Sequence, residues 1–263
     1  DTMAGLFFFG LLIALCVCIL VYMYRLAHQD RVIDHTFEFS TFPSDETITI
    51  FFISDIHRRV ISNEIIGQVK GKADFVLIGG DLAEKGVPLD RIKENLTKLK
   101  SVGPVYFIWG NNDDEIDRHE LDALYVEMDI TELLDTSVLF ETREGGKIRL
   151  LGIDFYDEDK QTGRLDLAME EAESDSFRIL ASHTPKIEKE IEKSYGIDLV
   201  LSGHTHGGQI RIFGMGRYKL GGVSERNDTT ILTSNGYGTS LLPLRLTAKP
   251  ETHLIHLKKL TPS

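Results

Sequence analysis

The sequence is poor in cysteine, and its two thiols do not lie where they could cross-link a folded domain. Cys16 and Cys18 both fall inside an apolar run near the beginning of the chain, and the residues after it contain no cysteine. A scaffold held together by disulfides and a cysteine-ligated structural zinc site are therefore excluded there. The absence of a disulfide fits a reducing compartment but does not require one.

Positive charge is also scarce. The chain has 29 Lys and Arg residues against 41 Asp and Glu residues, so its formal net charge is −12. An acidic surface repels nucleic acid, and no cluster of Lys or Arg is interleaved with aromatic residues. We therefore expect no nucleic-acid partner and disfavour a nuclease. No Gly-Lys-Ser/Thr sequence follows a glycine-rich strand end, so a P-loop nucleotide site is excluded as well.

Charge is missing altogether from residues 3–24, which form one long apolar run. About 20 apolar residues span the hydrocarbon core of a bilayer as a helix. A cleaved signal peptide is the alternative, but it has a shorter apolar core, a basic start and a small-residue cleavage site. We therefore predict an uncleaved transmembrane anchor over residues 1–25. Arg25 and Arg31 follow the run, which places the rest of the chain on the cytoplasmic side of the cell membrane. An exported domain is the alternative orientation.

After the anchor we expect a juxtamembrane linker and a first strand over residues 26–45, and one α/β domain over residues 46–263. Its helices are predicted over 64–69, 89–99 and 114–128, where apolar residues recur at helical spacing. Residues 154, 157, 158 and 159 are acidic and follow a predicted strand at 148–153, so we expect them in an exposed loop or at the rim of a substrate site. The sequence leaves the oligomeric state open.

Polar residues with metal-binding side chains follow five strand-like runs. These runs are rich in apolar and β-branched residues, the pattern of a buried strand. Residues 48–53 are followed by Asp55 and His57, residues 74–78 by Asp81, residues 105–109 by Asn111, residues 177–181 by His183, and residues 198–202 by His204 and His206. Sites in open α/β sheets assemble at the carboxyl ends of strands, so we expect these side chains to meet.

The segment Gly203-His204-Thr205-His206 is the most informative of the five, because it places two imidazoles two residues apart at a strand end. Two solvated loop histidines are the alternative interpretation. Imidazole is the commonest metal-binding side chain, and the upstream carboxylates and amide complete a mixed oxygen and nitrogen set. Seven candidates are too many for one tetrahedral ion but suit two ions that share a carboxylate. The set favours Mn²⁺, with Fe²⁺ or Zn²⁺ as alternatives, and disfavours Ca²⁺.

The ordered set Asp-x-His, Gly-Asp, Gly-Asn-x-Asp, Ser-His and Gly-His-Thr-His resembles the calcineurin-like metallophosphoesterase family over roughly residues 46–258. The resemblance implies a sandwich of two mixed β-sheets flanked by helices, with a dimetal site at one edge. It implies that Asp55, His57 and His206 hold one ion, that Asn111, His183 and His204 hold the other, and that Asp81 bridges them. Residues 207–210 and 235–243 resemble membrane-anchored bacterial members grouped with UDP-2,3-diacylglucosamine hydrolases.

One position departs from the family pattern. Most members have a histidine after the Gly-Asn pair, and this chain has Asn112. An amide can donate a hydrogen bond to a phosphoryl oxygen, but it cannot act as a general acid at neutral pH. Leaving groups that need little protonation should suffer least, which favours a phosphodiester or pyrophosphate bond. Asp113 is expected to orient His183 or a loop amide and not to bind a metal ion.

Together these features predict a membrane-anchored, dimetal-dependent phosphoesterase. Its expected mechanism is attack on phosphorus by a hydroxide held between the two ions, with Asn112, Asp81 and His204 as the catalytic residues. The expected partners are the membrane and a small phosphorylated substrate, for which a lipid- or nucleotide-linked compound is a candidate. A catalytically weak, metal-stabilised membrane scaffold or binding protein is the alternative.

Overall fold

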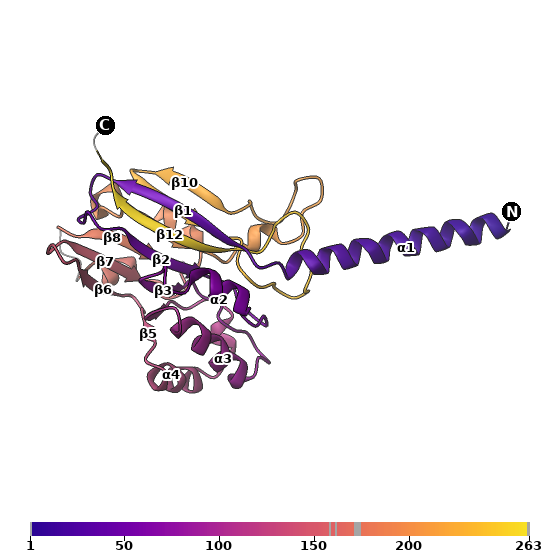
Figure 1. Ribbon diagram of the computed structural model, residues 1–263, viewed down its shortest axis with the longest axis horizontal. Helices are drawn as coiled ribbons and strands as arrows, with labels where there is room; N and C mark the ends of the chain where they lie inside the picture. Colours follow the sequence, from indigo (N-terminus) through magenta and orange to yellow (C-terminus); the bar gives the residue numbers. More distant parts are fainter. Residues whose placement is uncertain (1, 158, 161, 171–174, 262–263) are drawn as a thin grey trace.

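The fold consists of two six-stranded sheets that pack face to face, with helices on the outer faces (Figure 1). The computed structural model describes residues 2–157, 159–160, 162–170 and 175–261. Both sheets combine parallel and antiparallel pairs. The predicted sandwich of two mixed sheets is therefore confirmed.

The first sheet has the strand order β1-β12-β2-β3-β4-β5. Its strands are β1 (Val32–Phe39), β2 (Ile48–Ile53), β3 (Phe75–Ile78), β4 (Val105–Phe107), β5 (Thr131–Glu132) and β12 (Thr252–Lys259). The edge strand β1 pairs in parallel with β12, and Val32 lies opposite Thr252 in the register. The strand expected after the apolar run is therefore held by the last strand of the chain.

The second sheet has the strand order β10-β11-β9-β8-β7-β6. Its strands are β6 (Thr136–Glu141), β7 (Lys147–Gly152), β8 (Phe177–Ala181), β9 (Leu199–Ser202), β10 (Gly222–Arg226) and β11 (Thr229–Thr233). β7, β8 and β9 are parallel neighbours, so their carboxyl ends meet at one edge of the sheet. β10 is exposed along its whole length, which explains why no apolar pattern predicts it.

The helices flank these sheets. They are α2 (Asn63–Val69), α3 (Leu89–Lys100), α4 (Arg118–Glu127) and α5 (Leu165–Glu170), with the short 3₁₀ helices η1 (Asp113–Glu115), η2 (Pro185–Lys189), η3 (Lys193–Tyr195) and η4 (His206–Gly208). The prediction of a single helix over residues 114–128 is wrong, because this segment forms two separate helices, η1 and α4. The Asp117 side chain accepts hydrogen bonds from the backbone of His119 and Glu120 at 2.9 and 3.4 Å, and so begins a new helix.

Because side chains alternate along the central strands, each sheet has a hydrophobic core on both of its faces, and the two sheets share the core between them. In β2, Ile50 and Phe52 lie in the core between the sheets, whereas Phe51 and Ile53 pack in the core that contains the buried residues of α2 and α3. A strand that is buried on both faces reads as a continuous apolar run. The site at the strand ends is therefore mounted on fully packed elements.

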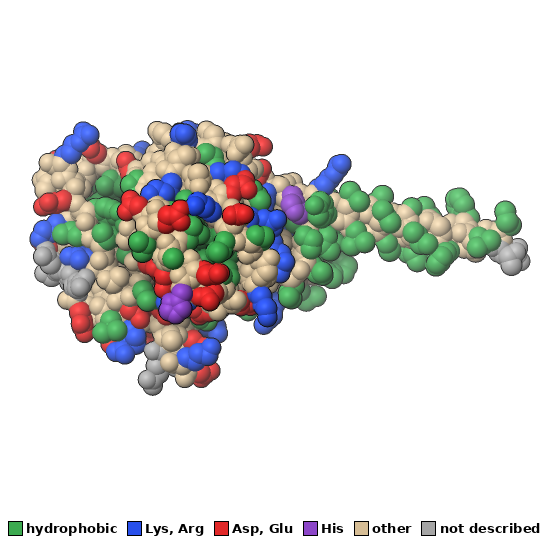
Figure 2. Space-filling view, turned by 90° about the horizontal axis from the view of Figure 1, so that it is seen from below, with side chains coloured by type: hydrophobic (Ala, Val, Ile, Leu, Met, Phe, Trp, Pro, Cys, Tyr) green, Lys and Arg blue, Asp and Glu red, His purple; other side chains and the backbone are tan. Residues whose placement is uncertain are grey.

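The helix α1 (Thr2–Ala27) projects away from the sandwich, and its side chains are apolar on all sides (Figures 1 and 2). In the part of the chain that the structure describes, it is the one helix long and apolar enough to cross a membrane. It continues two residues past the expected boundary at residue 25. Met23, Leu26 and Ala27 are buried against the domain, so α1 is joined to it directly.

Candidate metal centre

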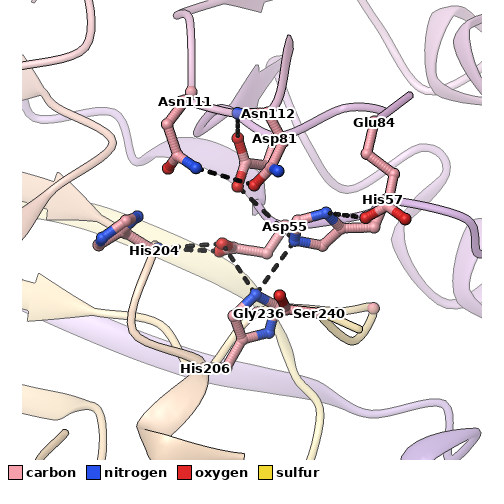
Figure 3. A network of polar contacts seen from close by, with 12 residues as sticks. Asp55, His57, Asp81, Glu84, Asn111, Asn112, His204, His206, Gly236 and Ser240 are labelled. Atoms are coloured by element: carbon pink, nitrogen blue, oxygen red, sulfur yellow. Dashed lines mark hydrogen bonds and ion pairs between the residues drawn. The ribbon is translucent and has the colours of Figure 1, made fainter. Parts of the chain in front are cut away.

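All seven predicted ligand residues lie together where the strand ends of the two sheets meet. Five strands supply them: β2, β3 and β4 of the first sheet and β8 and β9 of the second. Figure 3 shows the side chains of Asp55, His57, Asp81 and His206 directed toward one another, with the Asn111 amide beside Asp81. The backbone N–H of His204 donates to both Asp55 carboxylate oxygens at 3.1 Å. The packing of the two sheets thus assembles groups that are up to 151 positions apart in the sequence.

One group of potential ligands comprises Asp55, His57 and His206, all buried. One ligand atom of each lies within 4.8 Å of the others. The His57 and His206 Nε2 atoms face each other at 3.1 Å, and Asp55 Oδ1 lies 3.5 Å from His206 Nε2. These are the three residues that the resemblance assigns to one ion.

A second group lies beside the first and contains His183. Asp81 Oδ2 is 3.3 Å from His183 Nε2, and His204 Nδ1 is 3.2 Å from the same nitrogen. Asp81 Oδ2 also lies 3.6 Å from His57 Nε2, so this carboxylate contacts a histidine of each group. Asp55 Oδ1 does so too, because it lies 3.9 Å from His183 Nε2. Both carboxylates therefore occupy the position that a shared ligand needs.

The backbone at these residues is unusual. Five of the candidate ligands have a positive φ: Asp55 (55°), His57 (52°), Asp81 (51°), His204 (71°) and His206 (48°). Residues other than glycine seldom adopt this region, and each such residue costs on the order of 1–3 kcal/mol. These sharp turns reverse the backbone immediately after each strand, so that the side chains converge. The packing of the two sheets offsets the free-energy cost of the strained backbone.

Gly80 shows how closely the segments approach. It has φ +86°, and a Cβ atom at this position would lie 2.5 Å from His183 Nδ1. His183 Nδ1 in turn lies 2.8 Å from the Gly79 carbonyl oxygen, which fixes the ring with its Nε2 toward Asp81. The glycine pair before Asp81 is therefore needed for the close approach of β3 to the histidine after β8.

Charge and burial oppose each other in this cluster. Burial favours the neutral form of His183, yet the adjacent Asp81 carboxylate prevails and raises the pKa of His183 to about 10. Burial also pushes up the pKa of Asp81, but the neighbouring His183 holds it below its usual range. Burial lowers the pKa of His206 to about 3. The Asp81 carboxylate thus favours positive charge at His183, where a divalent cation would compete with the imidazole proton.

The residues fit two divalent cations. Asn111 Nδ2 donates to Asn112 Oδ1 at 2.9 Å, but the buried Asn111 Oδ1 has no hydrogen-bond partner among the residues that the structure describes. A buried acceptor without a donor is costly, and a cation would satisfy it. The facing imidazole nitrogens and the two carboxylates supply the remaining donors of a mixed oxygen and nitrogen set. The family and the residue groups together indicate a dimetal site.

Several supporting groups surround this set. Asp113 accepts hydrogen bonds from the backbone N–H groups of Asp81, Ala83 and Gly110 at 2.7, 3.2 and 2.9 Å, which is the role at loop amides that its position predicts. The Glu84 carboxylate lies 3.0 Å from His57 Nδ1 and was not anticipated. The sequence did contain a signal for this role, because Glu84 follows Asp81 by three residues and metal-binding histidines are commonly oriented by a carboxylate.

Arg245 is a second group that sequence reasoning missed. Its side chain is fully buried and donates to the carbonyl oxygens of Asn235 and Gly238, each at 2.7 Å, and of His206 at 3.2 Å. Burial lowers its pKa to about 10. The glycine-rich segment after β11 is thereby held against the backbone of His206. No local pattern distinguishes this arginine from a surface one.

The side chain of Asn112 lies at the rim. Its Nδ2 donates to Glu115 Oε1 at 3.0 Å, and its backbone N–H donates to Asp81 Oδ1 at 2.8 Å. Contact between this amide and a phosphoryl oxygen stays a prediction. In the acidic segment after β7, Asp157 is half-buried and Asp159 is exposed, whereas residue 158 lies outside the described residues.

Comparison with known proteins agrees with this geometry. The sequence model of the family described as calcineurin-like phosphoesterase matches residues 48–208. The uncharacterized protein YpbG of Bacillus subtilis (strain 168) is 40% identical over 250 residues, which are 94% of this chain and 95% of that protein. Phosphodiesterase YaeI of Escherichia coli (strain K12) is 27% identical over 79% of this chain and 81% of its own length.

The fold recurs in the solved structure of Haemophilus influenzae NAD nucleotidase (NadN). The TM-score is 0.51 at 16% sequence identity, over 73% of this chain and 46% of that one. This chain therefore spans about half the length of that protein. At this identity the likeness concerns the fold alone.

Proposed function

We propose that this chain, which belongs to the calcineurin-like phosphoesterase family, hydrolyses a phosphodiester or pyrophosphate bond with two divalent metal ions. Its membership of this family and its buried groups of potential metal ligands identify the chain as a metal-dependent phosphoester hydrolase. The observation that supports the proposal best is the convergence of five buried carboxylate and imidazole side chains where the strand ends of the two sheets meet. They are Asp55, His57, Asp81, His183 and His206.

In this proposal Asp55, His57 and His206 hold one ion and Asn111, His183 and His204 hold the other. Of the two carboxylates that contact both groups, Asp81 would be the shared ligand, because its Oδ2 lies closer to His183 Nε2 (3.3 Å) than Asp55 Oδ1 does (3.9 Å). Mn²⁺ is the ion we expect, with Fe²⁺ or Zn²⁺ as alternatives. A bound pair of such ions polarises a phosphoryl oxygen and makes water nucleophilic at neutral pH.

The protein's own groups then fix this set in place. Glu84 orients the His57 ring from its other nitrogen, and Asp113 holds the backbone of Asp81 and Gly110 through two hydrogen bonds. Asn112 stands where the resemblance to the family places a general acid, and its amide N–H is too weakly acidic to protonate a leaving group. A leaving group that is stable as an anion avoids this requirement. A phosphodiester or pyrophosphate fits better than an alkyl phosphomonoester, and the name of the Escherichia coli relative agrees with it.

We further propose that α1 anchors the enzyme in the cell membrane. A removable signal peptide accounts less well for α1, because Met23, Leu26 and Ala27 are buried against the domain and would be lost with it. Arg25 and Arg31 favour the cytoplasmic side for the domain. The substrate in this proposal is a small phosphorylated compound, lipid- or nucleotide-linked, encountered at the membrane, and no nucleic acid is involved.

The assay that tests the hydrolase is Mn²⁺-dependent turnover of bis-p-nitrophenyl phosphate beside p-nitrophenyl phosphate, using the full chain in detergent with and without a chelator. We expect diester turnover that is lost with the chelator and in Asp81→Ala and His204→Ala. Asp90→Ala and His119→Ala are matched controls, because both residues are exposed on helices away from the site and should keep full activity.

The same assay separates the enzyme from a metal-stabilised scaffold. A scaffold would also bind ions, so metal content does not distinguish the two. Two bound ions without turnover on either ester would favour the scaffold. Full turnover in both Asp81→Ala and His204→Ala would show that the chemistry lies elsewhere.

A further inference from the structure

The domain is attached to α1 without a free linker. The Arg245 backbone N–H donates to the Met23 carbonyl at 3.1 Å. The Arg59 guanidinium donates to the carbonyl oxygens of His28 and Gln29 at 2.8 and 3.0 Å, directly after the helix ends. The last turn of α1 is therefore part of the folded domain and sets the orientation of the domain relative to the helix.

The exposed part of α1 has the length of a bilayer core. Residues 2–22 project beyond the buried turn, and at about 1.5 Å per residue they span about 30 Å. The hydrocarbon core of a typical bilayer is also about 30 Å thick. If α1 spans the membrane, no length remains to hold the domain away from it. The surface around the base of α1 must then lie at the lipid headgroups.

Two loops on that surface expose large apolar side chains and lie beside the base of α1 (Figure 1). Ile212, Phe213 and Met215 come from the loop before β10, and Leu241 and Leu242 come from the loop before β12; we call these five residues the membrane face. The side chains of Phe213 and Leu241 are 95% and 97% exposed. Such a cluster is unfavourable in water unless a partner covers it.

The two loops form one unit that is continuous with α1. Gln209 Nε2 donates to the carbonyl oxygens of Ser240 and Leu242, both at 3.0 Å, and so joins the first loop to the second. Leu241 also lines a hollow with Ala27 and His28 at the end of α1. Figure 2 shows apolar side chains that continue from α1 onto this end of the domain.

Basic side chains gather at the same end, although the chain as a whole is acidic (Figure 2). Arg25 lies in the last turn of α1, and Arg217 lines a cavity together with Leu241. Arg58 lines the hollow beside Ala27, where it pairs with Glu84. Apolar side chains ringed by basic ones are typical of surfaces that contact anionic lipid headgroups. The cluster is continuous with an apolar helix, which favours a lipid surface over a soluble protein partner.

That cavity lies between the membrane face and the segment that carries His204 and His206. It has a volume of about 280 Å³ and is lined by Thr205, Gly208 and Tyr218 on the side of the site and by Ile210, Leu241 and Leu242 toward the membrane face. Thr205 stands between the two histidines of the tetrad, and the Tyr218 ring centroid lies 6.2 Å from that of His204.

We infer that the membrane face rests in the headgroup layer and that the cavity admits an amphiphile with a phosphodiester or pyrophosphate headgroup directly from the bilayer. The part of this inference that concerns the substrate rests on the proposed hydrolase and on α1 as its anchor. The part that concerns the surface does not depend on catalysis. The apolar portion of such a substrate stays near Leu241 and Leu242 while its phosphorus approaches His204.

Depth-dependent quenching tests the surface without any turnover. The full chain carries Cys16→Ser and Cys18→Ser, and one cysteine is placed by Phe213→Cys, Leu241→Cys or the control Val126→Cys, then labelled with an environment-sensitive fluorophore. Val126 is 82% exposed and lies on α4, away from α1. The protein is reconstituted into vesicles of phosphatidylglycerol and phosphatidylcholine that contain a lipid-borne quencher.

We expect labels at 213 and 241 to shift to the blue and to lose emission to the quencher, whereas the label at 126 stays unquenched. Equal quenching at all three positions, or none at 213 and 241, overturns the membrane face. A blue shift without lipid quenching also overturns it, because it places a protein partner or a second copy on the surface.

A kinetic test addresses the substrate. The double variant Phe213→Ser with Met215→Ser should turn over a phospholipid diester in vesicles about tenfold more slowly, since two apolar side chains no longer enter the membrane. Neither residue lines the cavity, so turnover of soluble bis-p-nitrophenyl phosphate should not change. Equal turnover of the vesicle substrate by variant and wild type refutes the route from the bilayer. If the wild type does not hydrolyse soluble bis-p-nitrophenyl phosphate at all, the proposed function is refuted instead.

Discussion

Gly110→Ala is expected to disable the metal centre through one added methyl group. Gly110 follows β4 and lies beside Asp81, the shared ligand in our proposal. A Cβ atom at this position would lie 2.2 Å from Asp81 Oδ1 and 2.4 Å from the Asp81 backbone nitrogen, whereas ordinary contacts begin near 3.4 Å. The carboxylate or the loop after β4 must therefore move by about 1 Å.

The surroundings leave little room for that movement. Asp81 Oδ1 accepts from the Asn112 backbone at 2.8 Å, and Asp113 Oδ2 accepts from both the Asp81 and the Gly110 backbone at 2.7 and 2.9 Å. Overpacking of this kind costs about 1–3 kcal/mol of stability. A displacement of about 1 Å at a catalytic group costs roughly 10²-fold in rate. We therefore expect a folded enzyme with much lower kcat/KM and a melting temperature reduced by about 5 °C.

The assay is Mn²⁺-dependent hydrolysis of bis-p-nitrophenyl phosphate, with metal content and thermal unfolding measured on the same samples. Gly67→Ala is the matched control, because Gly67 is exposed in α2 and a Cβ atom there meets nothing within 4 Å. It should keep full activity and gain up to about 1 kcal/mol of stability. If Gly110→Ala kept the metal content and activity of the control, the reasoning from close approach would be refuted.

Three further predictions concern chemistry and stability. Asn112→His should speed hydrolysis of an alkyl monoester such as glycerol 2-phosphate by tenfold or more, because it restores a general acid. Turnover of p-nitrophenyl phosphate should change little. Slower turnover of both esters would contradict the leaving-group argument. Burial, reinforced by His35, lowers the pKa of His253 to about 3, so the folded protein binds fewer protons than the unfolded chain below pH 6.5. The free energy of unfolding should therefore fall by about 2 kcal/mol from pH 7.5 to pH 5 through this residue, and the decline should be shallower in His253→Gln when chemical denaturation is measured at both pH values. Dialysis against a chelator should lower the melting temperature and Mn²⁺ should restore it, since ions that bind only the folded state stabilise it; a melting temperature that ignores both treatments would argue against the centre.

Local patterns were sufficient for the elements that carry the site. The strand expected at 177–181 is β8, and the strand expected at 48–53 is β2, residue for residue. Short runs rich in apolar and β-branched residues favour a strand buried on both faces over a helix. The run expected at 105–109 ends two residues early, because β4 stops at Phe107. The helix expected over 114–128 failed because the Asp117 cap, a competing local interaction, divides it.

The sequence by itself determined which residues could form the centre, since ligand chemistry and position after a strand are properties of short segments. Only the tertiary structure decided that Asp55 as well as Asp81 contacts histidines from both groups, that Glu84 lies behind His57, and that Arg245 holds the backbone behind His206. It also decided that the loops at residues 213 and 241 flank α1. These contacts join segments far apart in the chain, and their energies depend on how the two sheets pack, which no local pattern encodes.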